Sequence, residues 1–253
     1  MVKNEADIVG AAVRHLFAEG VDGMVVAENG SSDETLETLR RLSVEFPIKI
    51  VADPEPAYYQ AKKMTALANL AGESGADWVI PFDADEIWCA SSGTVADTLR
   101  ASDEDVVAAR VINHLAHWRR AWKRDLFDRL ALRERDPYPL PKVAFRYKAG
   151  ISLIQGNHGL DGLEPPEPSG LLEIRHFQYR SFRQFHRKVT NGQRAYALTD
   201  LPSTAGGHWR ALGQRNRLWL LVTWIRHCAR PDLVKDRAPV GFKWIRRRPR
   251  FRG

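Results

Sequence analysis

The stretch Trp78-Val79-Ile80-Pro81-Phe82-Asp83-Ala84-Asp85-Glu86, residues 78–86, joins a short apolar run to three carboxylates. The apolar run predicts a buried strand, and alternate side chains of an extended segment share a face. Asp83 and Asp85 can therefore converge on one point, where they repel each other unless a cation lies between them. Oxygen ligands suit Mg²⁺ or Mn²⁺, held partly by protein and partly by substrate phosphates. A solvated acidic turn is the alternative that this stretch alone leaves open.

The residues before this stretch alternate between helix and strand patterns. Apolar residues at helical spacing predict helices over 6–19, from 31 to the break at Pro47, and over 59–70, the second of them opened by a capping box of Ser31 and Glu34. Short apolar runs predict strands at 24–27 and 48–51. This alternation is typical of an α/β fold with a mostly parallel sheet flanked by helices. Ligands of such sheets bind beyond the carboxyl ends of the strands, which is where Asp83 and Asp85 lie.

The charges are unevenly distributed along the chain. Residues 1–110 have a net charge of −11, residues 111–225 of +10 and residues 226–253 of +8. Such asymmetry suggests an anionic partner, a cation in the acidic part, or both. The basic half contains predicted helices over 181–200 and 209–228.

Length and composition exclude several classes of protein. With 253 residues and 44% hydrophobic side chains, the chain can form a sizeable core, unlike a disordered, fibrous or disulfide-stapled miniprotein. Two distant cysteines, Cys89 and Cys228, favour a reducing compartment and offer no cysteine zinc site. The N-terminus is charged where a signal peptide is apolar, and the longest apolar stretch, 218–225, is too short to span a bilayer. We therefore expect a cytoplasmic protein.

A second polar segment, Glu28-Asn29-Gly30-Ser31-Ser32-Asp33, lies between a predicted strand and a predicted helix. Backbone N–H groups and the positive end of a helix favour an anion or a polar ribose edge at such a place. An ordinary strand-to-helix turn is the alternative. Lys62 and Lys63 on the next helix either contact the ligand or are ordinary surface charges.

Taken together, these motifs resemble the family-2-type glycosyltransferases, specifically the bacterial subset that opens with an Asn/Asp-Glu-Ala-Asp box. Four segments in the expected order carry the resemblance: residues 3–8, 28–35, 75–86 and 176–185, the last with a His-x-x-Tyr-Arg-Ser motif and followed by Lys188 and Asn191-Gly192. The resemblance spans residues 2–195. One departure is Glu28, where relatives commonly have Asp.

The resemblance implies a GT-A (Rossmann-like) fold, a nucleotide-sugar donor linked to UDP, GDP or dTDP, and Mn²⁺ or Mg²⁺ as the cofactor. It places Asp83, Asp85 and His176 at the metal, and an imidazole ligand favours manganese. The donor contacts that it implies are Asn4, Glu5, Glu28, Asp33, Lys63, Asp83, Arg180 and Lys188. Arg180 and Lys188 are expected to stabilise the charge of the leaving diphosphate.

An inverting transfer also needs a base for the acceptor hydroxyl. The segment Asn157-His158-Gly159-Leu160-Asp161 makes His158 and Asp161 the candidates. The alternatives are Glu164, Glu167 and Glu173.

We expect residues 1–200 to form the glycosyltransferase domain, with a nucleotide and metal half over 1–110 and an acceptor half over 111–200. Residues 201–253 are expected to be a basic, Trp-rich helical extension and tail. The tail is expected either to touch an anionic membrane, bringing the enzyme to a lipid-linked acceptor in cell-envelope glycan or glycolipid synthesis at the inner membrane face, or to be disordered and solvated. The alternatives are an anion-binding module without catalysis and a GT-A-like nucleotidyltransferase. Nucleic acid is disfavoured, because no nucleic-acid fold motif is visible and the acidic half repels phosphates.

Relatives precede the Asn-Glu box with an apolar strand, whereas this sequence has Met1 at that place. We therefore expect either a misassigned start or a sheet that lacks much of its first strand.

Overall fold

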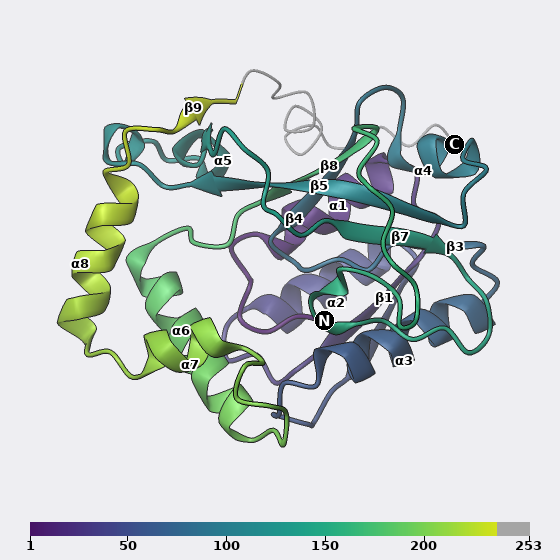
Figure 1. The fold of residues 1–253 in the computed structure, drawn as a ribbon, viewed down its shortest axis with the longest axis horizontal. Helices are drawn as coiled ribbons and strands as arrows, with labels where there is room; N and C mark the ends of the chain where they lie inside the picture. Colours follow the sequence, from purple (N-terminus) through teal and green to yellow (C-terminus); the bar gives the residue numbers. More distant parts are fainter. Residues whose placement is uncertain (237–253) are drawn as a thin grey trace.

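The computed structural model describes residues 1–236, which form an α/β fold (Figure 1). The helices are α1 Val9–Ala18, α2 Thr35–Glu45, α3 Gln60–Glu73, α4 Val95–Arg100, α5 Leu126–Arg129, α6 Phe182–Ala197, α7 Gly207–Gly213 and α8 Arg217–Cys228, with 3₁₀ turns η1 Trp118–Arg120 and η2 Gln155–Asn157. The strands are β1 Met24–Glu28, β2 Ile48–Ala52, β3 Trp78–Val79, β4 Glu86–Ala90, β5 Val106–Leu115, β6 Leu132–Arg133, β7 Lys142–Arg146, β8 Leu172–His176 and β9 Val234–Lys235. The predicted α/β class is confirmed, while the end of the tail, 242–253, lies outside the described residues.

The strands form two sheets with mixed directions. β1 and β2 pair in parallel, and β5 pairs in parallel with β8, but the other five ladders of the described residues are antiparallel. The prediction of a mostly parallel sheet is therefore wrong. Parallel neighbours need a long crossover, usually a helix, whereas the chain between β5 and β7 contains only η1, the four-residue α5 and the short β6.

The predicted helices over 6–19, 59–70 and 181–200 correspond to α1, α3 and α6. The predicted helix over 209–228 is interrupted, because the side chain of Asn216 accepts a bond from the Trp219 N–H and starts α8 as a separate helix. The capping box also differs from its prediction. Glu34 occupies the N-cap of α2 with no side-chain bond, and Ser31 Oγ accepts from the Asn4 N–H instead.

The core lies between the helices and the larger sheet, where Trp88, Phe145 and Phe177 are fully buried. α1 packs on α2 and on β4, so the N-terminal segment is fixed against the strand that follows the carboxylate motif. In the described part of the chain, no helix has the length and apolar character needed to cross a membrane.

An apolar space of about 680 Å³ lies between β1 and β3 and is here named the interstrand cavity. Its walls include Met1, Val2, residues 20–26, helix α3 and residues 74–82. Val2 pairs with the end of β1, donating to the Ala27 carbonyl at 2.8 Å and accepting from the Asn29 N–H at 3.0 Å. Further along the same edge of β1, the N–H and C=O of Val25 face the cavity and have no partner within residues 1–236. The smaller sheet is therefore bridged to the N-terminal segment at one residue only.

Candidate active site

The polar residues of the sequence motifs gather around a cavity of about 740 Å³, here named the site cleft. Its walls come from residues 1–5, the segment 56–63, the carboxylate motif, the start of β7 and helix α6. The carboxylate motif lies directly beyond β3, as expected for a ligand site in an α/β sheet. The cleft therefore combines both halves of the chain, the acidic and the basic.

Asp83 at the floor of the cleft is paired with a lysine from a distant strand. Lys142 Nζ lies 2.7 Å from Asp83 Oδ2 and also contacts the carboxylate of the fully buried Glu86. Burial would raise the pKa of Asp83, but the charge and hydrogen bond of Lys142, together with the charge of the Met1 α-ammonium, hold that pKa below its usual value. Burial raises the pKa of Glu86 to about 7. Lys142 thus pairs with two carboxylates, Asp83 and Glu86. Of the two, Glu86 has the higher pKa and binds a proton more readily.

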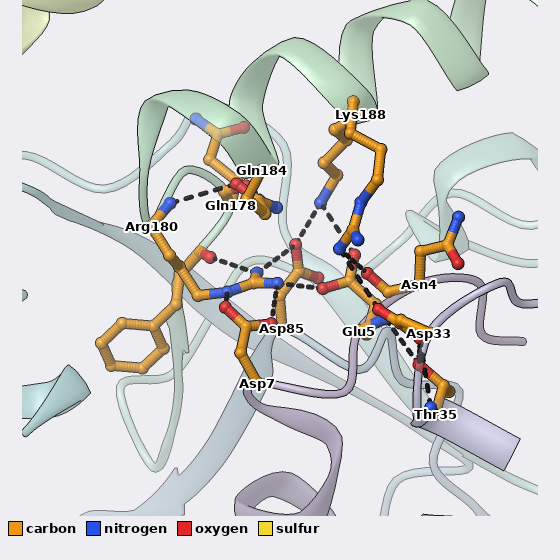
Figure 2. A network of polar contacts seen from close by, with 12 residues as sticks. Asn4, Glu5, Asp7, Asp33, Thr35, Asp85, Gln178, Arg180, Gln184 and Lys188 are labelled. Carbon is orange, nitrogen blue, oxygen red and sulfur yellow. Dashed lines mark hydrogen bonds and ion pairs between the residues drawn. The ribbon is translucent and has the colours of Figure 1, made fainter. Parts of the chain in front are cut away.

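Asp85 is buried deeper and is surrounded by cations. Lys188 Nζ contacts Asp85 Oδ2, and Arg180 approaches the same oxygen at 3.9 Å (Figure 2). Burial alone would raise the pKa of Asp85, but the charges of Lys188 and Arg180 and the hydrogen bond from Lys188 hold it far below its usual range. Asp85 is therefore an anion at any physiological pH.

Arg180 is not in the cleft but behind it. Its guanidinium is completely buried and contacts Glu5, Asp7 at 2.8 Å and the Phe177 carbonyl at 3.0 Å (Figure 2). The expected contact with a diphosphate is not available to a side chain with no exposed surface. Arg180 instead fixes the N-terminal box and Asp85 relative to each other.

His176 faces Asp85 with one nitrogen and is oriented through the other. Its Nδ1–H donates to Asn113 Oδ1 at 2.9 Å, because the Asn113 amide nitrogen already donates to Glu134 at 2.7 Å. Burial lowers the pKa of His176 to about 4, so the ring is neutral at pH 7. The Nε2 lone pair consequently points toward Asp85 Oδ2, 3.8 Å away.

The predicted three-ligand metal site is not formed. Within residues 1–236, no group of three or more histidine, cysteine or carboxylate side chains is arranged to hold a metal ion. The physical reason is Lys142, which holds Asp83, whereas His176 faces Asp85. The Nε2 lone pair of His176 and the Asp85 carboxylate do fit a cation bound between them. The Asn113 side-chain amide fixes the His176 ring through its other nitrogen, as is common for histidine ligands of metals.

The N-terminal box and the turn over 28–33 bind mainly to each other. Asn4 Oδ1 accepts from the Ser32 N–H at 2.7 Å, and the Glu28 carboxylate accepts from the N–H groups of Gly30 and Ser31 at 3.2 and 2.6 Å. Glu28 therefore closes its own turn and does not line the cleft, whereas Asn4 does.

Two further predicted donor contacts are also held by protein groups. Asp33 does not line the cleft. It accepts a hydrogen bond from the Thr35 N–H at 3.1 Å, and its carboxylate lies 3.3 Å from the Arg187 guanidinium. Lys63 lines the cleft, where its ammonium lies 2.7 Å from Asp53.

The two candidate bases lie in different environments. His158 lines the cleft, and its Nδ1–H donates to the Pro141 carbonyl at 2.7 Å, which leaves Nε2 as a free acceptor. Its ring passes so close to Gly156 that a Cβ there would lie 2.5 Å from Nε2. Asp161 is exposed and outside the cleft lining.

The comparison with protein families decides between the functional alternatives. The sequence profile of Glycosyl transferase family 2 matches residues 1–156. The chain belongs to this family. It is therefore a glycosyltransferase, and the α/β fold is the expected GT-A class, in preference to the binding module or the nucleotidyltransferase.

Matches to individual proteins are more distant. A search of curated proteins found no match. Among solved structures, this glycosyltransferase is similar to S. aureus TarS 1-349, with 13% identity, a TM-score of 0.43, and coverage of 86% of this chain and 69% of TarS 1-349. The complex of TarS 1-349 with UDP gives 10% identity, a TM-score of 0.43, and coverage of 84% and 67%. A further structure of S. aureus TarS gives 10% identity, a TM-score of 0.40, and coverage of 84% of this chain and 41% of that chain.

Several residues of the glycosyltransferase cleft were not predicted from the sequence. They are Gln60, Asn113, Tyr138, Lys142, Gln155 and Tyr196. Lys142 had one signal in the sequence, because a lysine next to the apolar run Val143-Ala144-Phe145 of a strand needs a partner if the strand is buried.

Proposed function

We propose that this glycosyltransferase moves a sugar from a nucleoside-diphosphate sugar to a hydroxyl acceptor, with the reacting groups in the site cleft. The observation that carries the proposal is the pair Asp83 and Asp85, each held by a lysine at the floor of one cleft. Lys188 is a quarter exposed there and can contact a diphosphate, unlike Arg180. UDP, GDP and dTDP sugars are all candidates for the donor.

Lys188 and Lys142 place two positive charges next to the carboxylates. A leaving diphosphate gains negative charge as the glycosidic bond breaks, and preorganised cations stabilise that charge more than they stabilise the donor. We assign this role to Lys188, with Arg180 as the buried residue that keeps Asp85 and Glu5 in position.

Asp85 and His176 are the residues that we propose to hold Mn²⁺ or Mg²⁺, with donor phosphates and water as the remaining ligands. A divalent metal at such a place supplies Lewis-acid stabilisation of the leaving phosphate oxygens. A metal held by Asp85 would compete with the Lys188 ammonium for Asp85 Oδ2, and Lys188 would then be available to contact the diphosphate.

His158 is the base in this proposal. Its Nε2 takes the proton of the acceptor hydroxyl, the acceptor oxygen forms a bond to the anomeric carbon, and the bond from that carbon to the diphosphate oxygen breaks with its electron pair on the diphosphate. Attack from the side opposite the leaving group gives inversion. The acceptor is a hydroxyl compound of cell-envelope glycan or glycolipid synthesis, used on the cytoplasmic side of the membrane.

The test is a transfer and donor-hydrolysis assay with UDP-, GDP- and dTDP-sugars in the presence of Mn²⁺ or Mg²⁺. Asp85→Asn is expected to lower the rate by about 10²–10⁴-fold, because it removes the buried anion that we propose to hold the metal. Asp97→Asn is the matched control, because Asp97 is an exposed carboxylate on α4. Equal rates for the two variants, or no turnover of any donor by the wild type, would contradict the proposal.

A further inference from the structure

Helix α8 is apolar on two opposite faces, and among residues 1–236 only one of them has a packing partner. Leu220 is buried against Phe185 and Val189 of α6, with Trp224 beside it. Leu218, Val222 and Ile225 lie on the opposite side, at helical spacing, and Trp219 lies at its margin. These four side chains, the outer face of α8, are between 41% and 69% exposed. A helix that is apolar all round normally buries both faces.

A second exposed aromatic segment adjoins the end of α8. Trp118 and Trp122 in the segment 118–124, the Trp segment, are 60% and 72% exposed. The preceding residue, His117, is hydrogen-bonded to the backbone of Arg230, just beyond α8. The Trp segment therefore adjoins the C-terminal end of α8, and Figure 1 shows α8 leading to β9 at the end of the molecule where α5 also lies.

The segments that carry these side chains, 118–124 and 217–228, contain basic but no acidic residues. No acidic residue occurs between Asp200 and Asp232, or between Asp105 and Asp125. The exposed arginines that accompany the outer face of α8 are Arg215, Arg217 and Arg226. The three exposed tryptophans each have a cation over the ring: Arg119 at 5.1 Å from Trp118, Lys123 at 3.7 Å from Trp122, and Arg215 at 5.0 Å from Trp219.

We infer that the outer face of α8 and the Trp segment dock on the surface of an anionic lipid bilayer. Apolar side chains in the middle of a face, tryptophans at its margin and arginines around it are the composition of an interfacial helix. A second copy of the chain fits less well, because a symmetric contact would bring the arginines of both copies together. Nucleic acid would leave the exposed leucine and isoleucine without apolar partners.

The docking surface is also connected to the site cleft. α6 contacts α8 through Phe185 and Val189, and the same helix carries Lys188 into the cleft. The outer face of α8 is thus separated from the cleft by two helix layers, each about 10 Å thick. A bilayer at this face lies within reach of a lipid-linked acceptor, whereas the binding itself does not depend on the transfer reaction.

The test is co-sedimentation of the full chain with vesicles of pure phosphatidylcholine and of phosphatidylcholine mixed with phosphatidylglycerol. The wild type is expected to bind the mixed vesicles, and the double variant Leu218→Ser/Ile225→Ser to bind them about tenfold or more weakly. Val44→Ser, at an 88% exposed apolar residue of α2, is the matched control and is expected to bind like the wild type. Circular dichroism and thermal melting check that the variants fold.

Two further readouts separate the alternatives. Brominated phosphatidylglycerol is expected to quench tryptophan fluorescence, and Trp122→Phe and Trp219→Phe are each expected to reduce the quenched fraction. Equal vesicle binding by the wild type and the double variant overturns the inference, because the basic tail alone would then suffice. A concentration-dependent dimer that the double variant abolishes, seen by light scattering, also overturns it in favour of a second copy.

Discussion

The site cleft and the interstrand cavity have similar volumes, about 740 and 680 Å³, and both are lined in part by Met1 and Val2. Their walls differ in kind. The cleft brings together Asp83, Asp85 and two lysines, whereas the cavity has mainly apolar walls and strand edges without partners. The difference shows that volume does not identify a site. Charged groups that converge and have shifted pKa values identify a functional site. Apolar space between strand edges affects the stability of the fold instead.

Of the variants that compare the two regions, Lys142→Met has the largest expected effect, because it removes the shared cation of Asp83 and Glu86. We expect kcat/KM to fall about 10²–10³-fold and the free energy of unfolding to fall by about 3 kcal/mol, since one buried pair loses its partner. Transfer assays and denaturant unfolding measure the two effects. Lys49→Met, at an exposed lysine beside the interstrand cavity, is the control and should change activity less than about twofold. Similar losses in both variants would remove the distinction between the two regions.

His158→Gln is expected to lower the transfer rate about 10²-fold, because a general base contributes on that order. The base acts in its neutral form, and burial lowers the pKa of His158 below its ordinary 6.5. The wild-type rate should therefore stay level as pH falls to 6.5 and decline only below it, and His158→Gln should lose this acidic limb. His186→Gln, outside the cleft lining, should keep both rate and limb. A limb that persists in His158→Gln would assign the base to another residue.

The next effect is on stability. The α-ammonium of Met1 is buried, and within residues 1–236 its hydrogen-bond partner is the Met64 sulfur, at 3.5 Å; burial lowers its pKa. Lengthening the chain ahead of Met1 by a short valine-rich segment replaces this charge with a peptide group and offers partners to the edges of β1 and β3. We expect a rise in Tm of about 2–4 °C per kcal/mol gained. Any change in transfer activity should be the same for every extension, because each removes the ammonium charge that acts on Asp83. A Gly-Ser extension of equal length should give no rise, and equal melting of the two would show that the cavity does not accept a strand.

Asp161→Asn should have the smallest effect, a change in transfer rate of less than about twofold. Asp161 is exposed and lies outside the cleft lining, so it does not reach an acceptor bound there. A rate comparable to that of His158→Gln would reverse the ranking of the two candidate bases.

The sequence predicts the elements of the N-terminal half well because each carries its own period. It also predicts that the carboxylate motif and Lys188 belong to the site. The motif follows a strongly patterned apolar segment, and Lys188 lies in a predicted helix. It does not predict Lys142 or Asn113, because both depend on which distant strands become neighbours: β7 beside β3, and β5 beside β8. The burial of Arg180 is equally invisible, because the partners that enclose it, Glu5 and Asp7, are far away in the sequence.

The central claim is that the site cleft binds a nucleoside diphosphate through Lys188 and the carboxylate motif. Isothermal titration of UDP, GDP and dTDP, each with Mn²⁺, into the wild type and Lys188→Met tests it most directly. We expect one site in the wild type for at least one nucleotide, and about tenfold or weaker binding in Lys188→Met, because a charged contact to phosphate is worth 1.4 kcal/mol or more. Equal affinity in the two proteins, or no binding of any nucleotide to the wild type, would contradict the claim.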